Sequence, residues 1–203
     1  ALMLNYTHLN YIVKTLLRAF YILPWLFTAT IIAIIWRLLL DPIGIINHIL
    51  IFLNIIEDNI EWFSSTDLAL NSVTFVNIWA GYPFYMVSLL AGLQSVPQDL
   101  YEAAGIDGAN KIQKFIHVTL PHLKPIILTI ILLDFIWTMQ VFPLIWMTTG
   151  GGPLYSTEML STFTYKLAFS SYKFSLASAS SFIVLLISLS VSIFYIKNQF
   201  RNE

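Results

Sequence analysis

The chain has 203 residues, of which 58% are hydrophobic and only 10% are charged, and its mean hydropathy is +0.76. An average soluble domain has about 25% charged residues, so this composition is too poor in polar groups to cover a water-soluble domain. A net charge of −1 excludes a basic field for nucleic acid. The lack of cysteine excludes disulfides, thiolate metal sites and thiol nucleophiles in these residues. The sequence therefore predicts an integral membrane protein.

Long uncharged segments predict the membrane spans, because a helix of about 20 residues crosses the hydrocarbon core. The predicted spans are 19–40, 68–93, 125–148 and 174–196. Segment 42–56 is also uncharged but too short to span, so it is expected to be an interfacial or outer-surface helix. The expected fold is all-α, a polytopic transmembrane helical bundle that forms a single domain over 1–203.

The basic residues predict the orientation of the chain. Seven of the ten fall on one side of the predicted membrane, namely Lys14, Arg18, Lys111, Lys114, Lys124, Lys197 and Arg201. The other side carries three basic residues beside six acids, namely Arg37, Lys166, Lys173, Asp41, Glu57, Asp58, Glu61, Asp67 and Glu158. The positive-inside rule makes the first side cytoplasmic.

The cytoplasmic loop 95–124 is predicted to begin with a short helix. Ser95 and Gln98 have the spacing of a capping box, and Gly105 and Gly108 mark the end of the helix. A helix of roughly ten residues is marginal in water, so it needs a surface to dock on. The residues alone fit docking on another protein and packing as a plain connector equally well.

The same loop carries a family signature. The letters EAA at 102–104, DGA at 107–109, Phe115 and Leu120-Pro121 resemble the EAA loop of ABC importer permeases. Further stretches of the family pattern follow in order, namely FYILPW at 20–25, NIWAGYP at 77–83, LQSVP at 93–97 and TGGGP at 149–153. Over nearly all of its length the chain resembles the sugar-importer branch, the maltose and glycerol-3-phosphate type.

This resemblance implies an ABC type I importer-like fold with a cytoplasmic coupling helix. The coupling residues it implies are Glu102, Ala103, Ala104, Gly105, Asp107 and Gly108. The implied partners are a cytoplasmic ABC ATPase dimer, a second permease subunit, an extracytoplasmic solute-binding protein and membrane lipid. By resemblance the solute-binding protein faces the loop 150–153, and the acidic outer surface 57–67 is a less specific candidate for the same contact. The implied location is the bacterial inner membrane. Such permeases have about six helices, so the sequence is expected to be a fragment lacking N-terminal spans, or else a chain with a processed start.

The sequence shows no motif for nucleotide binding, metal binding or catalysis. The glycines at 150–152 are followed by Pro153 rather than by the Gly-Lys-Ser/Thr of a P-loop. The four histidines lack the spacing of a metal pair, and no Ser-His-Asp arrangement is visible. We therefore expect no enzymatic activity, no metal and no cofactor in this chain, with ATP and magnesium bound by the partner ATPase.

Two predicted spans each present polar, small and aromatic residues on one helical face. The spacing i, i+3, i+4, i+7 groups Asn77, Ala80, Gly81 and Phe84, and likewise Asp134, Trp137, Thr138 and Val141. Aromatic rings suit the apolar faces of a sugar, and amides or carboxylates suit its hydroxyls. By resemblance these eight positions correspond to the family's sugar contacts, although Asp134 replaces a neutral polar residue and Val141 replaces an amide.

Three functions fit the sequence. The favoured one is a permease subunit of a binding-protein-dependent importer for a sugar, oligosaccharide or polyol. A second is an ion-coupled secondary transporter with Asp134 as its titrating site. A third is a permease subunit without substrate contact, in which Ala80 and Gly81 allow close helix approach and Asn77 bridges helices. Pro83 and Pro143 predict kinks or gate hinges.

Overall fold

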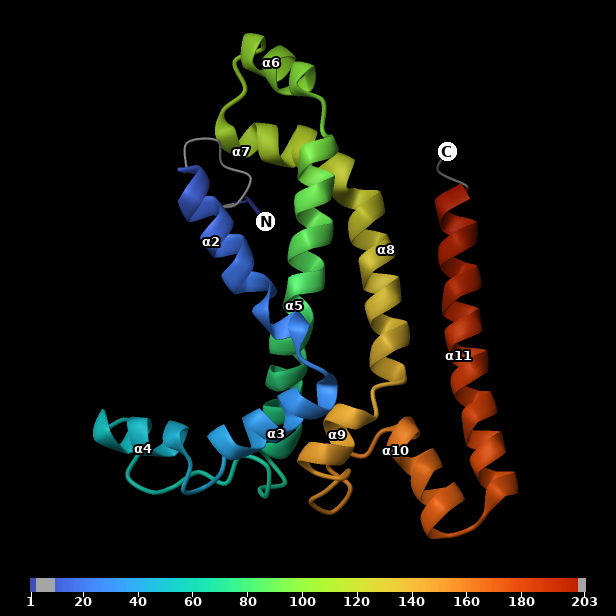
Figure 1. The fold of residues 1–203 in the computed structure, drawn as a ribbon. Helices are drawn as coiled ribbons and strands as arrows, with labels where there is room; N and C mark the ends of the chain where they lie inside the picture. The colour runs from blue at the N-terminus through green and yellow to red at the C-terminus, as the bar shows by residue number, and fades with distance from the viewer. Residues whose placement is uncertain (3–9, 201–203) are drawn as a thin grey trace.

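A computed structural model describes residues 1–2 and 10–200 of the protein (Figure 1). Within this described part the chain forms helices and no strand, which confirms the predicted all-α class. The elements in chain order are α2 (Tyr11–Ile22), η1 (Leu23–Leu26), α3 (Ala29–Leu39), α4 (Ile45–Phe52), α5 (Ala69–Ser95), α6 (Gln98–Ile106), α7 (Lys111–Lys114), η2 (Phe115–Thr119), α8 (Leu120–Met139), α9 (Pro143–Thr148), α10 (Leu160–Tyr165), η3 (Lys166–Ser170) and α11 (Phe174–Phe200).

Three stretches of helix in the described residues are long and apolar enough to cross a membrane. They are Ala69–Ser95, Lys111–Met139 and Phe174–Lys197. They correspond to the second, third and fourth predicted spans. The third ends earlier than expected, at Met139, because the chain leaves the helix over 140–142 and a new helix begins at Pro143. The break predicted at Pro143 is therefore present, whereas α5 continues through Pro83.

The first predicted span, 19–40, is not a single helix in the structure. Tyr11–Leu26 and Ala29–Leu39 are bent by 98° relative to each other, and they count as a fourth span only if the pair is taken together. The bend has a local cause. Phe27 is extended, and the Thr28 hydroxyl accepts a hydrogen bond from the backbone N–H of Ile31, which starts α3 as a separate helix.

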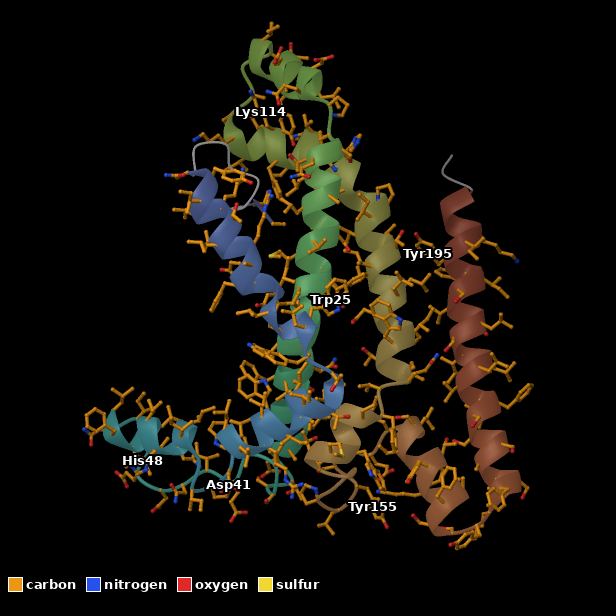
Figure 2. The ribbon with its side chains drawn as sticks, viewed as in Figure 1. Trp25, Asp41, His48, Lys114, Tyr155 and Tyr195 are labelled. Atoms are coloured by element: carbon orange, nitrogen blue, oxygen red, sulfur yellow. The ribbon has the colours of Figure 1, made fainter. Side chains whose placement is uncertain are left out.

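The elements sort into two ends of an elongated bundle (Figure 1). The start of α2, the helices α6 and α7 and the end of α11 lie at one end, as the charge-based orientation requires. The helix α4, the loop after α9 and the α10–α11 turn lie at the other. The long helix α11 is joined to α8 by the hydroxyls of Tyr195 and Thr129, which are 2.6 Å apart (Figure 2).

A buried core lies near the outer end, where α3, α5 and α9 meet. Its buried members are Ile32, Ala33, Leu40, Val76 and Leu144. The rings of Trp36 and Trp79 pack edge to face beside it, with centroids 5.3 Å apart. This core fixes the outer halves of α3 and α5 relative to each other, next to the cavity described below.

Candidate substrate cavity and coupling loop

A cavity of about 440 Å³ lies between α5 and α8. It is lined by Asn77, Ile78, Ala80, Gly81, Tyr82, Tyr85, Asp134, Trp137, Thr138 and Val141. The two helical faces predicted from spacing therefore meet, and all predicted residues except Phe84 line the cavity. Val141 does so from the segment just beyond α8. The volume falls within the range of small-molecule sites.

Phe84 is the one predicted residue that does not line the cavity. Its ring centroid is 4.9 Å from that of Trp137 and 6.3 Å from that of Trp25 in η1. Trp25 lies close against α5 in Figure 2. The three rings form an aromatic row that fixes one edge of Trp137, whose side chain remains 52% exposed. Sequence reasoning missed Trp25 as a site residue because its segment marked only the family resemblance.

Tyr85 is a further lining residue that sequence reasoning missed. Its hydroxyl lies beside the Asp134 carboxylate. The helical spacing contained the signal, since Tyr85 follows Gly81 by four residues on α5. Among the described residues that line the cavity, none is basic, and the polar groups are a carboxylate, an amide and hydroxyls. These groups can donate and accept hydrogen bonds to a hydroxyl-rich ligand.

Gly81 does not bring helices together. A Cβ built on it would meet only a Tyr85 ring atom, at 3.8 Å, so the residue leaves open space. Close packing of α5 on α8 occurs at Gly92 instead, where a Cβ would lie 2.6 and 2.7 Å from side-chain atoms of Ile126 and Leu123. The open position at Gly81 coincides with the cavity.

The coupling loop contains the predicted short helix, α6, at the tip of the cytoplasmic end (Figure 1). The predicted capping box at Ser95 and Gln98 is wrong. The Ser95 hydroxyl donates to the Gly92 carbonyl, and no side chain caps α6. A capping box forms instead where Asn110 and Gln113 start α7. The physical reason is that Pro97 occupies the N-cap position of α6.

The helix ends where the glycines predicted. Gly108 has a φ of +77°, which favours glycine, and its N–H donates to the Gly105 carbonyl. All the predicted coupling residues are exposed except Ala104, which is half-buried. Ile106 is 89% exposed, and sequence reasoning missed this large apolar residue at the tip. The loop therefore presents small, acidic and apolar groups together.

Side chains attach α6 to the base of α8. The hydroxyl oxygens of Tyr101 and buried Thr119 are 2.8 Å apart, and the Thr119 hydroxyl also points to the Lys114 carbonyl. That carbonyl precedes the π-helical turn η2, which leads directly into α8. The Lys114 amine lies against Gly105, because a Cβ there would be 2.9 Å from Nζ. The loop is thus tied to the span that carries Asp134.

The outer loop after α9 is held in a fixed shape. Gly150 and Gly151 have φ values of +63° and +91°. Lys166 forms an ion pair with Glu158, and both charged groups lie against Gly151, where no Cβ would fit. Leu154 is 86% exposed at the end of this loop. The predicted contact region 150–153 therefore belongs to an ordered loop with an apolar tip.

Comparison with known proteins places the chain among transport permeases. The family model for the binding-protein-dependent transport system inner membrane component matches residues 1–199. A probable ABC transporter permease protein of Brucella suis biovar 1 is 40% identical over 191 residues, covering 94% of this chain and 66% of the relative. The trehalose/maltose transport system permease protein MalF of Thermococcus litoralis is 36% identical over 195 residues, covering 94% of this chain and 64% of the relative.

The chain thus spans slightly less than two thirds of the length of these relatives. A solved structure shows the same fold. The crystal structure of a bacterial ABC transporter involved in the import of the acidic polysaccharide alginate aligns with a TM-score of 0.87 at 24% identity, over 98% of this chain and 70% of that one. The chain therefore belongs to the family of inner membrane components of binding-protein-dependent transport systems, as a multi-pass protein of the inner membrane.

Proposed function

We propose that this chain is the permease subunit of an ATP-driven, binding-protein-dependent ABC importer and forms its path for a carbohydrate. The observation that carries the proposal is the cavity between α5 and α8, where two mixed polar and aromatic faces converge. Trp137 and the tyrosines supply apolar faces for sugar rings, while Asn77 and Asp134 supply hydrogen-bonding groups. The trehalose/maltose transport name of the Thermococcus relative supports a carbohydrate.

Asp134 narrows the proposed substrate. Its carboxylate lines the cavity without a basic side chain among the described lining residues. A phosphorylated or otherwise anionic saccharide would therefore meet like charge in this cavity. An uncharged sugar, oligosaccharide or polyol is the substrate that this lining favours.

The proposed partners act at the two ends of the bundle. At the cytoplasmic end, α6 docks on an ATPase dimer, which binds ATP and magnesium and supplies the only hydrolytic activity. Glu102, exposed on α6, is at this contact. At the outer end, the loop held by the Glu158–Lys166 pair receives the solute-binding protein. A second permease subunit completes the path.

Uptake by the reconstituted importer tests this proposal. The complex is purified through this chain, and the saccharide bound by its binding protein is identified by ligand screening and radiolabelled. We expect uptake to require both ATP inside the vesicle and binding protein outside. Glu102→Lys should lower uptake by about tenfold or more, because a charge-assisted contact contributes roughly 1.5–3 kcal/mol. Glu57→Lys makes the same charge change on the exposed segment after α4 and, at saturating binding protein, should leave uptake within about twofold.

Two other outcomes of this uptake experiment would contradict the proposal in different ways. Uptake that persists without ATP and follows an imposed proton or sodium gradient would assign the chain to the secondary transporters, with Asp134 as the titrating site. ATP-dependent uptake that is unchanged in Glu102→Lys would refute the coupling role of that residue and leave the transport function intact.

A further inference from the structure

A hydrophobic helix, α4, lies across the direction of α5 at the outer end of the molecule (Figure 1). It belongs to the uncharged segment 42–56. Its large apolar side chains are 50% to 87% exposed here, together with those of its flanks, namely Ile43, Ile45, Ile49, Phe52, Leu53 and Ile55. Soluble surfaces rarely expose so continuous an apolar patch, so something other than water covers it.

One side of α4 is clamped to the fold by a buried amide. Asn47 is 0% exposed, and its Nδ2 donates to the carbonyls of Pro42 and Ile60 at 3.0 and 2.8 Å. Its Oδ1 accepts from the indole N–H of Trp62 at 3.0 Å. Trp62 and its neighbour Phe63 pack against the core between α3, α5 and α9. The free side of the helix is therefore the one opposite Asn47.

The residues on the free side of α4 indicate whether lipid or protein covers it. Ile45, Ile49 and Phe52 lie on it at i, i+4 and i+7, and His48 is its single polar side chain. Protein-docking surfaces combine apolar anchors with several hydrogen-bonding groups and arginine, whereas this side has one histidine and no arginine. The helix itself carries no charged residue, with Asp41 before it and Glu57 after it. An apolar face without charge that borders an acidic loop fits hydrocarbon better than a protein partner.

The surface is also continuous with the membrane-facing part of the chain. The neighbouring helix α3 exposes Ile31, Ile34 and Leu38, the last to 68%. Figure 1 shows α3 and α4 following one another at the same end of the long helices. Exposed Leu38 and Ile43 carry this apolar surface from α3 toward α4, and the charged residues Arg37 and Asp41 lie at the junction of the two helices.

We propose that α4 is an in-plane helix whose free side is embedded among the acyl chains of the outer leaflet, and that Asn47 fixes this anchor to the core beside the cavity. The anchor holds the outer ends of α3 and α5 at one depth in the bilayer. This anchoring role does not depend on the transported substrate or on the coupling loop, so a test of it is independent of a test of the proposed function.

Site-directed fluorescence quenching tests the depth of α4. The 203 residues contain no cysteine, so one introduced cysteine carries one label when the other subunits are cysteine-free. The whole importer is reconstituted in vesicles of phosphatidylcholine and phosphatidylglycerol, with the label at Phe52→Cys or Ile45→Cys. Spin-labelled acyl chains and aqueous iodide serve as quenchers. Leu185→Cys on α11 is the reference for lipid, and Leu154→Cys on the outer loop is the reference for water.

We expect the α4 labels to be quenched by the spin-labelled lipid to within about twofold of the Leu185→Cys value and to resist iodide. Quenching by iodide at the level of Leu154→Cys would place α4 in water. Protection from both quenchers would show that a protein subunit covers it. Either result overturns the proposal.

A second variant tests the clamp. Asn47→Leu removes all three hydrogen bonds, so lipid quenching of the label at Phe52→Cys should fall by about half or more as α4 separates from residues 60–62. Asn59→Leu, at an exposed asparagine nearby, makes the same change and should leave the signal unchanged. Unchanged quenching in Asn47→Leu would refute the role assigned to this amide.

Discussion

Two glycines of α5 have different structural roles, one in helix packing and one in the cavity. Gly92 is buried, and its missing side chain lets Leu123 and Ile126 of α8 approach the α5 backbone. Gly81 lies eleven residues earlier, where its missing side chain leaves space in the cavity. Gly92 therefore contributes to helix packing, and Gly81 contributes to the volume of the cavity proposed for the substrate.

Alanine at each glycine separates the two roles. Both substitutions gain the same helix propensity, so the difference in melting temperature between them reports packing. Gly92→Ala should be less stable than Gly81→Ala by about 1–3 kcal/mol, because its Cβ overlaps two side chains. Gly81→Ala should instead raise the KM for uptake by a few-fold. Equal melting temperatures, with KM altered in neither variant, would contradict this assignment.

At the scale of elements, the coupling helix and the base of α8 form one unit. Tyr101 reaches from α6 to Thr119 at the end of the π turn, and Lys114 reaches back from the start of that turn to Gly105. The turn continues without a break into α8, which carries Asp134 and Trp137. Movement of α6 is expected to be passed to the cavity through these contacts.

Removal of one hydroxyl should loosen this unit. Tyr101→Phe and Thr119→Val each break the 2.8 Å contact, at a cost of about 1 kcal/mol. We expect each to lower sugar uptake several-fold, while the ATPase rate of the complex changes by less than twofold, so that fewer sugars are moved per ATP. Because both variants remove the same contact, the double variant should be no worse than the worse single one.

Thr119→Ser is the matched control, since it keeps the hydroxyl that Tyr101 contacts and should transport at close to the unmodified rate. If uptake and ATP hydrolysis fell in parallel in Tyr101→Phe, the tyrosine would serve ATPase docking or folding rather than transmission. Additive losses in the double variant would show that the two hydroxyls act independently.

At the scale of the whole molecule, the positions of long uncharged segments predicted the helices that are long enough to span the bilayer. The uncharged segment 68–93 became α5, and 174–196 lies within α11, because spanning the bilayer requires apolar length. Helical spacing likewise predicted seven of the ten residues that line the cavity, and it also named Phe84, which does not line it. The contact of Trp25 with Phe84 was not predicted, because it arises where separate segments meet. The bend near Phe27 was missed although its cause, the cap at Thr28, is local. The capping box predicted at Ser95 and Gln98 is absent because Pro97 occupies the N-cap position of α6.

The distribution of charge also predicts how the molecule sits in the membrane. The coupling tip and the outer loop lie at opposite ends of the bundle (Figure 1), and the positive-inside rule assigns the former to the cytoplasm. Ile106 and Leu154 are the suited probes, being 89% and 86% exposed. In intact cells from which the outer membrane has been removed, a membrane-impermeant maleimide should label Leu154→Cys directly. It should label Ile106→Cys only after the membrane is permeabilised. The reverse pattern would show that the chain is inverted, with α6 out of reach of any ATPase.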